Sequence, residues 1–101
     1  MRINTICGYQ QLTAGTLATA TTITPVEQAG TGLEPTAAIM SVSTTAIRYT
    51  DDGVTTPTAS VGIRLPAGIA PFLYQGNLDN FKAILESGTP TLDIMYVVTS
   101  D

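Results

Sequence analysis

Apolar and polar residues alternate with a period of two along most of the chain after Thr36. Because successive side chains of a strand point to opposite faces of a sheet, this alternation predicts strands with one buried face. The pattern is clearest in the last strand, around Ile94. The positions that we expect to face inward are Ala38, Met40 and Val42; Ile47 and Tyr49; Ala59, Val61, Ile63 and Leu65; Phe72 and Tyr74; and Leu92, Ile94, Tyr96 and Val98.

Short turn signals separate these predicted strands. Asp51, Asp52 and Gly53 combine two short side-chain acceptors with a glycine that is free to adopt positive φ, and Gly68 ends the next turn, Pro66-Ala67-Gly68. Residues 78–86 fit either a short helix or a turn followed by a strand. Strands on both sides favour a turn at 78–80 and then a strand with Phe81, Ala83 and Leu85 on one face.

The first third of the chain is rich in Thr, Ala and Gly and carries weaker signals. Residues 3–7 fit a short strand or an extended arm. Residues 17–24 are dominated by β-branched residues and predict a strand that ends at Pro25, followed by a loop over 26–35. The predicted organisation is an N-terminal strand or arm over 1–16 and one β-sandwich domain over 17–101.

Several short strands at intervals of about 8–12 residues indicate an all-β fold. We expect an antiparallel β-sandwich with an extended N-terminal segment, and a small barrel is the alternative. An even number of strands near eight would permit a jelly roll. The alternation does not specify the order of the strands.

The composition favours assembly over catalysis. Charged residues make up 12% of the 101 residues, about half the usual share, so neutral polar groups must cover most of the surface. Such a surface repels its neighbours weakly and suits a subunit of an assembly, although secreted β proteins share it. The net charge of −4 and four scattered basic residues argue against binding to nucleic acid. There is no apolar run that could span a membrane and no signal-peptide pattern, so we expect synthesis in a cytoplasm.

Catalytic and metal-binding patterns are lacking in this sequence. It contains no histidine, which rules out a Ser-His-Asp triad within one chain. Its single cysteine, Cys7, is expected to be a buried apolar residue, without an intramolecular disulfide or a cysteine-based metal site. The adjacent Asp51 and Asp52 suit a turn better than a catalytic pair, and a calcium loop would need further oxygen ligands. We therefore predict no catalytic, metal or cofactor site and no enzyme activity.

Two residue sets have a structural and a functional interpretation. Tyr49, Tyr74 and Tyr96 fall on inward-facing positions, so core packing is favoured over a platform for binding sugars. Arg48 and Arg64 fall on outward-facing positions beside the Asp51 turn. They are either solvated, with a weak ion pair to Asp51 or to the neighbouring aspartate, or part of a subunit interface.

The order and spacing of these motifs resemble a pattern found in small virion proteins of tailed bacteriophages. The resemblance covers about residues 36–98. The chain departs from the pattern in a longer loop, Val54-Thr55-Thr56, and in Thr50, where a second basic or polar residue is common. The motifs that carry it are Arg48-Tyr49-Thr50-Asp51-Asp52-Gly53, Pro57-Thr58-Ala59-Ser60-Val61-Gly62, Leu65-Pro66-Ala67-Gly68, Phe72-Leu73-Tyr74-Gln75-Gly76 and Leu92-Asp93-Ile94-Met95-Tyr96.

This resemblance implies a structural protein of the virion, made in the host cytoplasm, that decorates or cements the capsid shell. The implied partners are the major capsid protein and further copies of the chain, as a dimer or trimer, without nucleic acid or membrane. The candidate interface residues are Arg2 and Ile3, in a lead-in over 1–24 that would lie on the shell, together with Arg48 and Arg64. The alternatives are a neck, tail or fibre component and a glycan- or surface-binding module.

Overall fold

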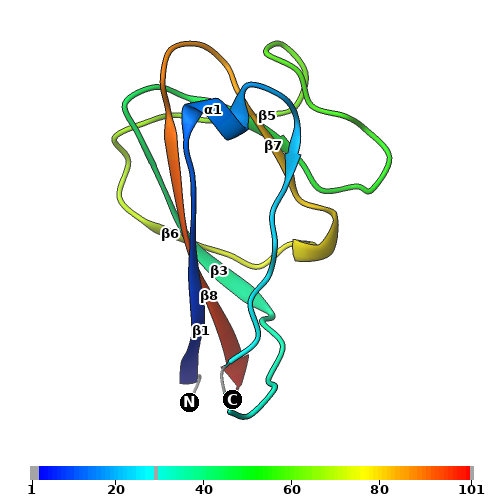
Figure 1. Cartoon of the computed structure of the whole chain (residues 1–101), viewed down its shortest axis with the longest axis vertical. Helices are drawn as coiled ribbons and strands as arrows, with labels where there is room; N and C mark the ends of the chain where they lie inside the picture. The colour runs from blue at the N-terminus through cyan, green and yellow to red at the C-terminus, as the bar shows by residue number, and fades with distance from the viewer. Residues whose placement is uncertain (1–2, 29, 101) are drawn as a thin grey trace.

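The computed structural model describes residues 3–28 and 30–100. In these residues the chain forms eight strands, a helix of four residues and one short 3-10 turn (Figure 1). The strands form two antiparallel sheets of four strands each. The prediction of an all-β fold is therefore confirmed.

The two sheets differ in the length of their strands. Sheet A has the order β1-β8-β3-β6 and sheet B the order β2-β7-β4-β5. The chain changes sheet at every connection between strands except the one from β4 to β5. The strands of sheet A are β1 (Ile3–Leu12), β8 (Thr91–Ser100), β3 (Ala37–Ser43) and β6 (Phe72–Tyr74), and those of sheet B are β2 (Thr21–Thr22), β7 (Lys82–Leu85), β4 (Ile47–Thr50) and β5 (Ile63–Leu65).

The hydrophobic core lies between the two sheets and follows the predicted alternation in most strands. Every second residue of β3 is buried, from Ala38 to Val42, as is every second residue of β8 from Leu92 to Tyr96. The two sets meet in register, since Val42 pairs with Leu92 and Ala38 with Tyr96. The inward positions predicted for β3 and β8 are thus confirmed, apart from the half-buried Val98.

Three aromatic rings form the part of the core nearest the end of β4. The Tyr49 ring stacks on the Phe81 ring with centroids 4.7 Å apart, and the Tyr74 ring meets both edge-on. Phe81 and Tyr96 are fully buried, Tyr74 is buried, and Tyr49 packs partly buried against the core. The core-packing interpretation of the tyrosines is therefore confirmed.

The segment 78–86 forms a turn and then a strand, as predicted. A 3-10 turn, η1 (Leu78–Asn80), precedes β7. Phe81 and Ala83 are buried and Leu85 packs against the core. The extended backbone of the flanking residues and their pairing with β4 outweigh the helical spacing, because so short a segment gains little from local helix formation.

The N-terminal third differs from the sequence prediction. From Ile3 onward the segment 3–12 is a ten-residue strand that pairs along its length with β8, with a bulge between Ile6 and Gly8. The predicted strand over 17–24 is wrong. Helix α1 (Ala14–Leu17) buries Leu17, and only Thr21–Thr22 forms a strand, β2. Leu17 and Ile23 both reach the core, but from a helix and a loop. Their odd-numbered positions therefore do not reflect the alternation of a strand.

The predicted strand over 59–65 is also wrong for its first half. Thr58 and Val61 close a tight turn with reciprocal backbone hydrogen bonds of 2.9 and 3.2 Å, and Gly62 has φ of +125°. The strand β5 therefore begins only at Ile63. Ala59 and Val61 are exposed, and Ile63 is 59% exposed although it pairs with Tyr49. Since β5 is an edge strand, its first residue lies where side chains of the other sheet do not cover it.

Candidate functional site

The turn after β4 is held together by one aspartate. Asp52 Oδ1 accepts hydrogen bonds from the backbone amides of Val54 and Thr55 at 3.0 and 2.8 Å, and its Oδ2 accepts one from the Thr55 hydroxyl at 2.6 Å. These bonds favour the carboxylate over the neutral acid, and they lower the pKa of Asp52 from 3.8 to about 2. Gly53 completes the turn with φ of +76°. Asp52 therefore shapes the loop, and both of its carboxylate oxygens are engaged within it.

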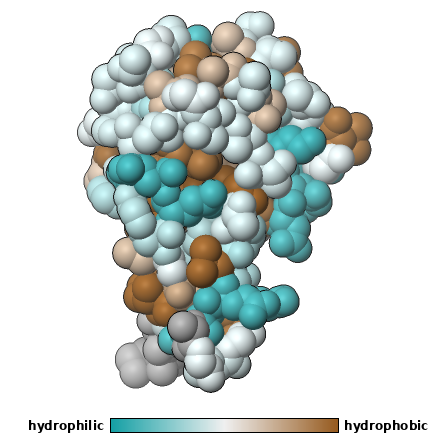
Figure 2. All heavy atoms as spheres, in the orientation of Figure 1, coloured by the Kyte–Doolittle hydropathy of each residue, from teal (hydrophilic) through white to brown (hydrophobic). Residues whose placement is uncertain are grey.

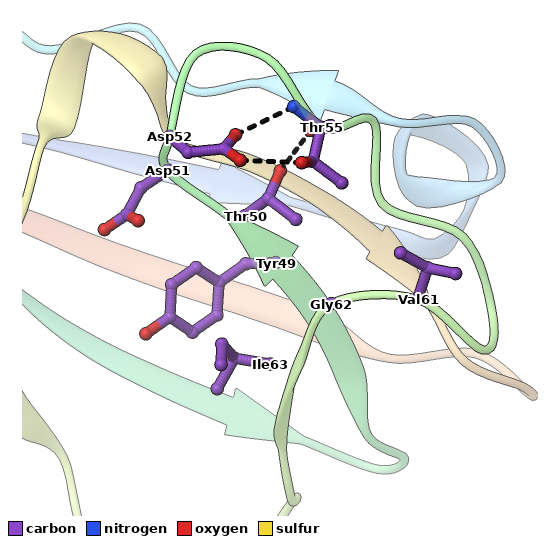
Figure 3. A pocket seen from close by; sticks show the side chains of 8 residues that line it. All are labelled: Tyr49, Thr50, Asp51, Asp52, Thr55, Val61, Gly62 and Ile63. Atoms are coloured by element: carbon purple, nitrogen blue, oxygen red, sulfur yellow. Dashed lines mark hydrogen bonds between the residues drawn. The ribbon is translucent and has the colours of Figure 1, made fainter.

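The neighbouring carboxylate points the opposite way, toward the core aromatics (Figure 3). The Tyr74 hydroxyl donates a hydrogen bond to Asp51 Oδ2. Burial and the negative charge of Asp51 both raise the pKa of Tyr74. Asp51 and Asp52 thus serve separate interactions on two sides of the chain, which agrees with their interpretation as turn residues and leaves no converging acid pair.

An open hollow of about 380 Å³ lies at the edge of sheet B beside this turn. Figure 3 shows Tyr49 and Ile63 next to each other on its floor, with Asp51 pointing to the same side and Val61 on the neighbouring loop. The hollow is shallow and mainly apolar, and its only charged groups are the two turn aspartates, one of which is engaged with Thr55. It offers contact area but no arrangement of acid, base and nucleophile.

The two candidate interface arginines face each other on the outer side of sheet B. Arg48 and Arg64 are direct partners in the β4–β5 register, and Glu86 lies between them. Arg64 Nε donates to both Glu86 oxygens at 3.1 Å, whereas Arg48 Nε makes a charge contact of 3.0 Å with Oε2. Hydrogen bonding to Arg64 lowers the pKa of Glu86. Glu86 therefore places one negative charge between two positive charges that would otherwise repel across the strands.

This cluster changes the interpretation of both arginines. Neither pairs with Asp51 or Asp52, contrary to the ion pair considered from the sequence. Arg48 also donates from its guanidinium to the Gly62 carbonyl at 3.0 Å, so it fixes the start of β5. The arginines are thus tied to the domain itself, and Glu86 compensates one of their two charges.

A small apolar patch lies at the narrow end of the molecule, where β1 begins and β8 ends (Figures 1 and 2). It consists of Ile6, Val26 and Leu33, and we call it the end patch. Ile6 is 49% exposed, Leu33 45%, and Val26 is also exposed. Gln28 links two of the three, since its side chain donates to the Ile6 carbonyl at 3.3 Å and its backbone amide to the Leu33 carbonyl at 2.9 Å. Hydrophobic atoms also appear at this end in Figure 2.

Acidic side chains border the end patch. Glu27 and Glu34 each adjoin a patch residue along the chain, and with Asp79 and two prolines they line a polar hollow of about 250 Å³. Among residues 3–28 and 30–100 no group of three or more acidic, cysteine or histidine side chains has an arrangement that could hold a metal ion. The end patch therefore has an apolar centre and a charged rim, as protein interfaces do.

The outer face of sheet A carries a second apolar row. Tyr9, Met95, Ile39 and Leu73 are aligned by the registers of four neighbouring strands. Tyr9 and Leu73 are exposed at its two ends, while Met95 and Ile39 are half-buried between them. The next row is polar and contains Gln11, Asp93 and Ser41. The Tyr9 hydroxyl and the Gln11 side-chain amide both donate to Asp93 Oδ1, at 2.5 and 3.0 Å. The row is narrow and ends at the strand β1.

The remaining predicted positions are placed as follows. Arg2 lies outside the described residues, and Ile3 opens β1 at the narrow end, where it pairs with Ser100. Gly68 has φ of +81° and donates from its amide to the Val42 carbonyl at 3.1 Å. Cys7 is half-buried instead of fully buried, because it is the extra residue of the bulge in β1. Among the described residues, no helix has the length and apolar character needed to cross a membrane.

The sequence analysis identified neither the residues of the end patch nor Glu86 as site residues. Ile6 and Leu33 carried no periodic signal, and only the three-dimensional path of the chain brings them together. The link from Arg48 to Glu86 depends on the pairing of β4 with β7, since Glu86 lies two residues after Ile84, the register partner of Arg48. Comparisons of the chain with models of protein families, with curated proteins and with solved structures found no match.

Proposed function

We propose that the two sheets form a jelly roll. In a jelly roll of eight strands two Greek keys interleave, and the chain passes repeatedly between two four-stranded sheets. The order β1-β8-β3-β6 opposite β2-β7-β4-β5 supports this assignment, because the first and last strands are neighbours and each following pair is nested inside the previous one. The outer position of β1 replaces the free N-terminal arm of the sequence-based hypothesis for the residues from Ile3 onward.

We further propose that the protein is a non-enzymatic structural protein of a bacteriophage virion that decorates and stabilises the capsid shell. The resemblance of residues 36–98 to small virion proteins motivates this proposal. The observation that carries it furthest is the end patch, since a small domain with 12% charged residues exposes an apolar cluster with an acidic rim at one end. Apolar patches of this kind mark contact sites for other proteins.

The end patch gives the proposal a direction of binding. The narrow end would face the major capsid protein, with Ile6 and Leu33 in the contact and Glu27 and Glu34 opposite basic groups of the shell. Ile3, one of the interface residues expected from the sequence, begins β1 in the same region. The broad end of the molecule, opposite the start of β1, would then point away from the shell (Figure 1).

A binding assay on purified capsids that lack this protein tests the proposal. Leu33→Asp places a charge in the centre of the end patch and should lower the affinity at least about tenfold, because burying a large apolar side chain contributes roughly 1.5–3 kcal/mol. Val54→Asp is the matched control, since Val54 is 86% exposed in the loop held by Asp52. Equal binding of both variants would contradict the proposed orientation, and failure of the wild-type chain to bind would contradict the function.

Copy number on the virion separates shell decoration from the neck or tail alternative. A shell protein should be present in hundreds of copies per particle, and an axial component in about six to twelve. Quantitative gel densitometry against the major capsid protein measures the ratio directly. The glycan-binding alternative is less well supported, because Tyr74 and Tyr96 are buried and Tyr9 is the exposed tyrosine of the described residues.

A further inference from the structure

The two sheets have four edge strands, and three of them are protected. Strand β2 has two residues, and β5 and β6 have three each. Pro66 directly follows β5 and Pro71 directly precedes β6. Short edges and adjacent prolines are the usual means by which proteins prevent edge-to-edge pairing. These edges therefore offer little to another strand.

The fourth edge strand, β1, has none of this protection. It has ten residues, from Ile3 to Leu12, and contains neither a charged residue nor a proline. It pairs with β8 on one side and is the outermost strand of its sheet on the other. Its one irregularity is the bulge at Cys7, which leaves the regular edge over residues 8–12. Figure 1 shows β1 running along the front of the molecule for most of its length.

The registers show which backbone groups of β1 face this open edge. The Val42 carbonyl bonds to Gly68 and the Val97 carbonyl to Thr36, so Val42 faces away from β8 and Val97 faces β3. Alternation along β8 then directs Leu92, Ile94 and Tyr96 toward β1, where their partners are Leu12, Gln10 and Gly8. The backbone amides and carbonyls of Tyr9 and Gln11 consequently point outward.

Further contacts agree with this assignment of the backbone groups of β1 that point outward. The Ile6 carbonyl, which also points outward, accepts its hydrogen bond from the Gln28 side chain instead of from β8. The side chains of Tyr9 and Gln11 are directed over the outer face to Asp93. In the described part of the chain, no loop bonds to the backbone of Tyr9 or Gln11.

We propose that this edge pairs antiparallel with β1 of a second copy, so that two A sheets join into one sheet of eight strands across a two-fold axis. A register centred on Gln10 places Tyr9 opposite Gln11 of the second copy, and the reverse. Both outward-facing residues then form hydrogen-bonded pairs, with four backbone bonds in total. A single strand with these two residues is complementary to itself, which is what a two-fold interface requires.

Charge does not oppose this pairing. Residues 3–12 are uncharged, and the nearest acidic group on the same sheet is Asp93 of β8. The two copies of Asp93 would be separated by three strand spacings, about 14 Å, which exceeds the screening length at physiological salt. The inference does not depend on the capsid proposal, because it concerns free protein in solution.

Sedimentation velocity of the full chain over a wide concentration range tests this proposal. We expect a reversible monomer–dimer equilibrium for the wild type. Gln11→Pro removes an outward-facing amide and retains the bonds to β8, and Gln11→Lys adds a charge at the edge without changing the backbone. Each should weaken dimerisation at least tenfold. Ser41→Lys is the control, because Ser41 also flanks Asp93 on the outer face but lies on the inner strand β3.

Amide hydrogen exchange locates the interface independently. The amides of Tyr9 and Gln11 should exchange slowly at high protein concentration and fast on dilution, whereas those of Gly8 and Gln10 should be slow throughout. A monomer at all concentrations, a trimer, unchanged dimerisation of both Gln11 variants, or exchange of Tyr9 and Gln11 that is independent of concentration would each overturn the proposal. Pairing of β1 with a strand of another protein while the free chain stays monomeric would do the same.

Discussion

Removal of the Phe81 ring should destabilise the domain more than the same change at Phe72, which is only half-buried. Phe81 is fully buried and is the central ring of the aromatic cluster, stacked on Tyr49 and edge-on to Tyr74 at a centroid distance of 5.1 Å. Tyr74 belongs to sheet A and Tyr49 to sheet B. Phe81 therefore connects the two sheets at this end of the core.

The size of the effect follows from the burial. Replacing a buried Phe by Ala costs about 3–5 kcal/mol, because transfer free energy is lost and a cavity remains. The whole domain is expected to be stable by roughly 5–15 kcal/mol. With an m-value of about 1.5 kcal/mol per molar urea, a loss of about 4 kcal/mol lowers the unfolding midpoint by roughly 2.5 M.

Phe72→Ala provides the matched control. Phe72 undergoes the same chemical change on β6, but it is only half-buried and packs at the margin of the core. Its loss should cost about 1–2 kcal/mol, since only part of its surface is removed from water. Equilibrium urea unfolding followed by far-UV circular dichroism measures both variants. If Phe81→Ala cost no more than Phe72→Ala, the aromatic cluster would not be a major link between the sheets, and the argument would be wrong.

Three further predictions concern the turn, the hairpin and the ion pairs. Stability should fall as the pH drops from about 4 to 2, because Asp52 has a folded-state pKa of about 2 against an ordinary value of 3.8, and Asp52→Asn should flatten this part of the pH profile. Gly62→Ala should destabilise by about 1–3 kcal/mol in thermal unfolding, since φ is +125° and the added Cβ would lie 2.9 Å from the Tyr49 carbonyl oxygen. Glu86→Gln should leave the two facing arginines unneutralised and lower the melting temperature, more at low salt than at 1 M salt.

The alternation predicted those parts of the fold in which one face of a strand is buried along its whole length. Strands β3 and β8 lie in the middle of sheet A, so both neighbours and the opposite sheet enforce the pattern, and their predicted core positions are correct except for the half-buried Val98. The segment 59–65 has the same alternation, but it lies at an edge and begins in a turn. There the pattern carries no information about where coverage by the other sheet ends, so Val61 and Ile63 are exposed.

The candidate site was less predictable for a related reason. Local patterns identified Asp51 and Asp52 as turn residues, and their hydrogen bonds are local ones. The partners of Arg48 depend on register between strands, which the sequence does not specify, so the ion pair with Glu86 was missed. The end patch depends on contacts between β1 and a loop about 20 residues later, such as that of Ile6 with Gln28, and no periodicity links these positions.

The distribution of charge connects the two proposed contacts. Three of the four basic residues, Arg48, Arg64 and Lys82, lie on the outer face of sheet B. Their charges disfavour the packing of another sheet against this face. Strand β1 has no charge and contributes Ile6 to the end patch and Tyr9 to the open edge. Water can satisfy the edge backbone of an isolated monomer, so the fold does not require a partner there. However, a ten-residue edge without protective residues is an aggregation hazard unless it pairs in a defined way. A two-fold β1 pairing would remove that hazard, and because the paired strands run antiparallel, the two end patches would lie at opposite ends of the dimer, so that one of them at a time could face a shell.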